Sequence, residues 1–176
     1  MSDLARRRFD ELAAPYLDDA FSLARWLAGN ASDAEDIVQD ACLRLLKSRA
    51  DAPVAHPRAF MLAVVRNTAL SWLAKNRPRA LVSVGGAEEA ETHPDAVEPL
   101  ATASAEAALI AAAEREEIEA AIAELPLALR ETLVMREVNG LSYREISEAL
   151  ETPIGTVMSR LARARAQLAT KLGARR

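Results

Sequence analysis

Apolar residues recur every three or four positions over most of the chain, and this spacing predicts α-helices rather than strands. Capping residues mark two of the helix starts. Ser32 with Glu35, and Ser142 with Glu145, both have the pattern of a capping box. The expected helices cover about 3–28 with a break near Pro15, 32–47, 58–76, 105–124, 126–138, a short stretch from Ser142, and a last stretch opened by Thr152 and Pro153. The pattern therefore predicts an all-α fold.

Composition agrees with an all-α chain. Its 176 residues include 38 alanines, the best helix former, and only 6 glycines. A hydrophobic fraction of 51% is sufficient for a core and excludes global disorder. The first ten residues are charged and lack an apolar signal segment, and no apolar run approaches the length of a membrane span. We therefore expect a cytoplasmic protein without membrane insertion.

The distribution of charge divides the chain into three parts. Residues 1–79 and 118–176 each carry a net charge of +2, whereas residues 80–117 carry −8. Two basic regions suit two contacts with a polyanion, although Lys and Arg on helices often only solvate an exposed face. Residues 80–104 contain glycines, prolines and acids without a helical period, so we expect a flexible acidic linker there. Small helical domains are expected on either side of it, over 1–79 and 105–176.

The C-terminal segment has the pattern of a helix-turn-helix: a short helix, a tight turn and a longer basic helix. On the last helix, Val157, Leu161 and Ala164 begin an apolar stripe that should face the core. Small polar residues and arginines occupy the other side, which suits reading of the DNA major groove. The candidate DNA contacts are Thr156, Ser159, Arg160, Arg163 and Arg165.

Catalysis has little support in the sequence. His56 and His93 lie beside prolines and have no neighbouring set of metal ligands. A glycine-rich phosphate loop and a nucleophile elbow are both missing, and Cys42 is a single cysteine. We expect neither an enzyme nor a metal or cofactor site.

The segment from Leu125-Pro126 through Leu141-Ser142-Tyr143-Arg144-Glu145-Ile146 to Gly155-Thr156-Val157 and on to Arg165 resembles the C-terminal domain of bacterial sigma factors, above all the extracytoplasmic-function (ECF) group of the sigma-70 family. The resemblance implies that this domain binds the minus-thirty-five promoter element and the flap of the polymerase β subunit. It also implies regulation by an anti-sigma factor, as in many members of the group.

Residues 32–41, Ser-Asp-Ala-Glu-Asp-Ile-Val-Gln-Asp-Ala, resemble the segment that docks on the clamp helices of the polymerase β′ subunit in that family. The spacing places Val38, Ala41 and Leu45 on one side of a helix and the acids on the other. Acids around an exposed leucine suit a basic partner helix. The expected polymerase-binding residues are Asp36, Gln39, Asp40 and Leu43.

Residues 58–67, Arg-Ala-Phe-Met-Leu-Ala-Val-Val-Arg-Asn, resemble the family's segment for the minus-ten element, where the strands open and a base is captured from the stack. Capture needs phosphate ligands, and the loop 48–57 would form the base pocket by analogy. The expected minus-ten contacts are Arg58, Arg66, Asn67, Lys75 and Arg77.

Two alternatives to a sigma factor stay open. A sigma-like decoy would bind an anti-sigma factor and never reach DNA, although the arginines of the last helix argue against it. A conventional helix-turn-helix regulator would bind DNA without polymerase and would need an apolar ligand pocket between residues 9 and 79.

Overall fold

The structure is a computed structural model that describes residues 3–47, 54–76 and 105–174. In these ranges it contains helices and turns and no strand, which confirms the all-α prediction. The elements are α1 (Asp3–Leu12), the short 3₁₀ helix η1 (Ala14–Tyr16), α2 (Leu17–Ala28), α3 (Ala31–Lys47), α4 (Pro57–Asn76), α6 (Ala105–Ala123), α7 (Leu127–Glu137), α8 (Tyr143–Ala149) and α9 (Ile154–Ala174). The expected linker over 80–104 and the first part of the expected loop 48–57 lie outside the described residues.

The first four α-helices form an N-terminal lobe, in which α2 packs against both α3 and α4. Leu23 of α2, Ile37 of α3 and Leu62 of α4 are completely buried where these helices meet. Gly29 ends α2 in the left-handed conformation, with φ at +88°, and its N–H donates to the carbonyl of Arg25. A residue without a Cβ adopts this conformation without strain, so the chain turns sharply into α3.

The start of α3 corrects one prediction. Asn30 caps the helix, not Ser32: its Oδ1 accepts from the N–H of Asp33 at 2.8 Å, and its Nδ2 donates to the Asp33 carboxylate at 2.7 Å. The cap therefore lies two residues before the predicted Ser32, and α3 begins at Ala31. Asn30 and Asp33 have the three-residue spacing of a capping box, and an asparagine caps as well as a serine.

Helices α6 to α9 form a C-terminal lobe, with α7, α8 and α9 around a core that includes Met135, Ile146 and Leu161. The capping box predicted at the start of α8 is confirmed. The Ser142 hydroxyl accepts from the N–H of Glu145, and the Glu145 carboxylate accepts from the N–H of Ser142. The turn from α8 leads directly into α9, which completes the helix-turn-helix.

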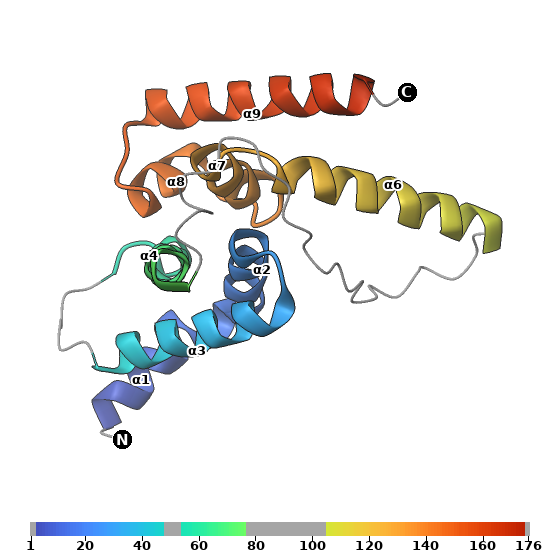
Figure 1. The fold of residues 1–176 in the computed structure, drawn as a ribbon. Coiled ribbons are helices and arrows are strands. Elements are labelled where there is room, and N and C mark those ends of the chain that lie inside the picture. The colour runs from blue at the N-terminus through green and yellow to red at the C-terminus, as the bar shows by residue number, and fades with distance from the viewer. Residues whose placement is uncertain (1–2, 48–53, 77–104, 175–176) are drawn as a thin grey trace.

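The two lobes pack against each other, α2 on α7 and α4 on α8 (Figure 1). Buried apolar residues of both lobes form one continuous cluster. Asn139, in the turn after α7, donates from its side chain to the Asp19 carbonyl of α2 at 3.1 Å. This contact leaves α3 on the outer side of one lobe and α9 on the outer side of the other (Figure 1).

Candidate polymerase and nucleic-acid interfaces

The exposed side of α3 carries the residues expected to bind polymerase. Asp36, Gln39, Asp40 and Leu43 are all exposed there. Ala41 lies on the opposite side of the helix and is completely buried. Asp40 forms an exposed ion pair with Arg44, which lies one helical turn further along α3, at 3.0 Å. Because exposed pairs of this kind contribute little stability, Asp40 is available to a partner.

Arg58, at the start of α4, forms a two-pronged ion pair with Asp19 of α2, at 2.7 and 2.9 Å. The hydrogen bonds from Arg58 hold the pKa of the Asp19 carboxyl below its usual range, against the opposing effect of partial burial. Asn139 of the other lobe adds a hydrogen bond to the same carboxylate at 3.3 Å. The Asp19 carboxylate therefore binds Arg58 of its own lobe and Asn139 of the other lobe at the same time.

Arg66, two turns further along α4, reaches across to the C-terminal lobe. Its Nε and Nη2 donate to the two carboxylate oxygens of Glu131 at 2.8 and 3.1 Å. Glu131 is only 2% exposed, and it also lies 3.5 Å from the guanidinium of Arg160 on α9. A buried carboxylate needs such partners, since the loss of its hydration would otherwise be uncompensated. One buried acid thus joins a candidate minus-ten arginine to a candidate minus-thirty-five arginine.

The remaining candidates on α4 are at the surface. Asn67 accepts a hydrogen bond from its neighbour Arg66 at 3.2 Å and is exposed, as is Lys75 near the end of the helix. Arg77 lies outside the described residues.

Helix α9 has the buried stripe that its sequence predicts: Val157, Leu161 and Ala164 have no more than 1% of their surface exposed. Ser159 and Arg163 are exposed on the outer side, and Thr156 is half-buried. Arg165 is exposed and pairs with Glu137 of α7 at 2.6 Å. Arg160 differs from its neighbours, because it lies toward Glu131 and only a quarter of its side chain, 25%, is exposed.

Comparison with known proteins assigns both lobes. Residues 12–79 match the sigma-70 region 2 family, and residues 115–168 match the sigma-70 region 4 family. The sigma-H factor of Pseudomonas aeruginosa is 32% identical over 168 residues, which cover 91% of this chain and 83% of that protein. The ECF sigma-E factor of Escherichia coli is 31% identical over 145 residues, which cover 81% of this chain and 75% of that protein. The chain belongs to the ECF group of the sigma-70 family.

Other relatives of this sigma factor have similar names. The ECF sigma factor SigE of Mycolicibacterium smegmatis is 31% identical over 91% of the chain, which spans only 60% of that longer protein. Among solved structures, the sigma factor RpoE of Bartonella quintana, in complex with the anti-sigma factor NepR, has a TM-score of 0.71 at 23% identity, covering 96% of this chain and 98% of that one. CnrH, in complex with the cytosolic domain of CnrY, has a TM-score of 0.66 at 22% identity, covering 96% and 90%. These two likenesses confirm the fold.

Sequence reasoning missed two features of this sigma factor. The first is the pair of acids, Asp19 and Glu131, that form ion pairs with the arginines of α4. Glu131 lies four residues after Leu127 and three before Val134, and this position on an apolar helix face was the available signal. The second is a pair of exposed apolar residues on α9, Ile154 and Met158.

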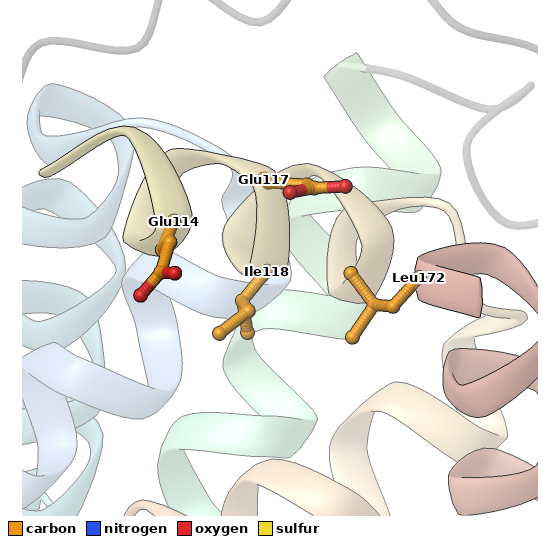
Figure 2. A pocket seen from close by; sticks show the side chains of 4 residues that line it. All are labelled: Glu114, Glu117, Ile118 and Leu172. Carbon is orange, nitrogen blue, oxygen red and sulfur yellow. The ribbon is translucent and has the colours of Figure 1, made fainter. Parts of the chain in front are cut away.

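A small hollow lies between α6 and the end of α9, lined by Glu114, Glu117, Ile118 and Leu172 (Figure 2). Its volume is about 100 Å³, well below the roughly 300–1,000 Å³ of small-molecule sites. It is not between residues 9 and 79, where a ligand-sensing regulator would need its pocket. The described part of the sigma factor has no cluster of His, Cys, Asp and Glu that could hold a metal ion, and none of its helices has the length and apolarity needed to cross a membrane.

Proposed function

We propose that this sigma factor directs core RNA polymerase to specific promoters and helps to open the minus-ten DNA. The observation that carries the proposal is the placement of two unlike faces on one chain. An acidic face with Leu43 lies on the outer side of α3, and a basic helix, α9, lies on the outer side of the other lobe (Figure 1). Both faces are accessible while the lobes are in contact.

In this proposal the α3 residues bind the clamp helices of the β′ subunit. Acidic side chains around an exposed leucine provide charge complementarity at the rim of a contact and apolar area at its centre. The C-terminal lobe would contact the β flap and, through Ser159 and Arg163 of α9, the minus-thirty-five duplex. Each contact is weak alone, and linkage through polymerase raises the effective concentration of the other.

The minus-ten contacts need a change in the lobe arrangement. Arg66 donates from Nε and Nη2 to Glu131 and from Nη1 to Asn67, and only 22% of its side chain is exposed, so the closed arrangement holds most of its donors away from DNA. We therefore assign the closed arrangement to the sigma factor before it binds promoter DNA, and an arrangement with the lobes apart to the promoter-bound state. Arg58, Asn67, Lys75 and Arg77 would then complete the minus-ten surface with Arg66.

An anti-sigma factor is a further proposed partner. The support is the shared fold: the Bartonella quintana structure contains a sigma factor of this shape with its anti-sigma factor NepR. A partner that holds the lobes together would keep Arg66 on Glu131 and so prevent promoter opening.

Reconstitution with core polymerase tests the proposal. The complex is given a library of promoters with randomised minus-thirty-five and minus-ten elements, and transcripts are counted for each sequence. Initiation that depends on both elements supports the proposal. Binding to an anti-sigma factor without initiation would favour a decoy, and DNA binding that needs no polymerase would favour a conventional regulator.

A further inference from the structure

Helix α9 has a second apolar line besides the one buried in the core. Ile154 and Met158 lie one turn apart on it and are 44% and 53% exposed. Ala162 and Ala166 continue the line at the same four-residue interval, and both are exposed. A row of apolar side chains is therefore exposed to solvent on this side of α9. The opposite side of the helix, at Arg160, faces the lobe contact.

The surroundings of this line are basic. Arg165 is exposed beside it and pairs with Glu137 of α7, Arg163 is exposed on the outer side of the helix, and α9 itself contains no acid. A large apolar side chain loses favourable burial when it stays in water, so an exposed pair at one end of a basic helix indicates a contact that is formed with a partner. The charges point to a polyanion as that partner.

The DNA major groove offers a partner for both the apolar line and the arginines near it. Thymine presents its C5 methyl there, and apolar side chains distinguish it from the other bases by direct contact, while arginines hold phosphates or guanines nearby. An α-helix fits the groove, and the exposed apolar pair lies in its first turns, the part of a recognition helix that contacts base edges.

We infer that Met158, supported by Ile154, reads the methyl group of a thymine in the minus-thirty-five element. The inference rests on the proposed function and adds to it, because neither Met158 nor Ile154 is among the minus-thirty-five contacts expected from the sequence. Met158 is flexible and polarisable, so it can follow the methyl of a thymine on either strand.

The test removes the methyl from the DNA instead of the side chain from the protein. The preferred minus-thirty-five element is taken from the promoter library, and each thymine is replaced in turn by deoxyuridine, which keeps every hydrogen-bonding group. Holoenzyme binding is measured for each duplex. Loss of one buried methyl should weaken binding about fourfold at one position.

Variants connect that position to the side chain. With Met158→Ala, the deoxyuridine effect at that position should disappear, because the methyl no longer has its partner. Val138→Ala is the matched control, since Val138 is a similarly exposed apolar residue outside α9. It should keep the fourfold effect.

Three results would overturn the inference while leaving the proposed function in place. They are a preferred element without any A·T pair, an element whose deoxyuridine forms all bind like the parent, and a Met158→Ala variant that weakens polymerase association equally on every promoter. The last would show that the line contacts protein. A wild-type holoenzyme without any promoter preference would refute the proposed function and this inference together.

Discussion

The pair between Arg66 and Glu131 should determine how much of the free sigma factor has its lobes together. Arg66→Met keeps the apolar stem of the side chain and removes the two hydrogen bonds to a carboxylate that is 2% exposed. Loss of a side chain that hydrogen-bonds to a buried charged group costs roughly 1.5–3 kcal/mol. Arg160 still lies 3.5 Å from Glu131, so the cost stays below the roughly 3–5 kcal/mol of a fully orphaned buried charge.

A cost of this size changes the ratio of closed to open molecules by about ten- to a hundredfold, since about 1.4 kcal/mol corresponds to a factor of ten. The ratio can be measured by fluorescence energy transfer in a Cys42→Ala background. Dyes on Glu11→Cys and Ala166→Cys report the distance between the lobes, because both positions are exposed, on α1 and α9. The measurement is made without DNA or polymerase, so a loss of DNA contacts by Arg66 does not affect it.

Arg44→Met is the matched control. Arg44 is 51% exposed and pairs with Asp40 on its own helix, at 3.0 Å, so its loss should leave the lobe distance unchanged. Adding Glu131→Gln to Arg66→Met should cost less than the sum of the two single changes, because they remove the same contact. An unchanged distance distribution in Arg66→Met would refute the argument that this pair holds the lobes together.

Three further predictions concern other surfaces. Asp36→Arg combined with Asp40→Arg should abolish association with core polymerase in a binding assay while the circular dichroism stays unchanged, because both residues are exposed; wild-type association would remove the docking assignment. Arg163→Ala should weaken recognition of the minus-thirty-five element by roughly 1–3 kcal/mol if its contact with a base is bidentate, and an unaltered promoter preference would mean that another face of α9 enters the groove. Asp19→Asn should lower the free energy of unfolding at neutral pH by roughly 1.5–3 kcal/mol. The hydrogen bonds from Arg58 lower the pKa of Asp19 in the folded state below the value near 3.8 of the unfolded chain. The resulting stabilisation is therefore complete above pH 3.8 and is lost as the pH falls through the pKa of the folded state. Urea unfolding at a pH well below the folded-state pKa should show no difference between variant and wild type.

The helices and their faces were predictable because they follow from local rules. The apolar stripe of α9 and the capping box at Ser142 depend on spacing within one helix, and both are present in the structure. The Ser32 cap was wrong for a local reason as well. Asn30 follows the end of α2 directly and also caps α3, and the Ser32 pattern lies only two residues further along the chain.

The lobe contact could not be predicted, because it joins residues far apart in the chain. Arg66 and Glu131 are 65 positions apart, and nothing in the spacing around either residue specifies the other. The same holds for Asp19 and Asn139, which are 120 positions apart. The polymerase and DNA contacts themselves remain predictions, since they depend on partners whose surfaces are not in this chain.

The central claim is that both lobes act on one promoter within one polymerase complex. Cleavage of DNA by iron chelates tethered to the sigma factor tests it most directly. Chelates are attached singly to Ala74→Cys on α4 and to Ala166→Cys on α9, both exposed positions, in the Cys42→Ala background. The account predicts cuts near the minus-ten element from the first and near the minus-thirty-five element from the second, on the same promoter and only with core polymerase present. Cuts from one tether alone, or the same cuts without polymerase, would contradict it.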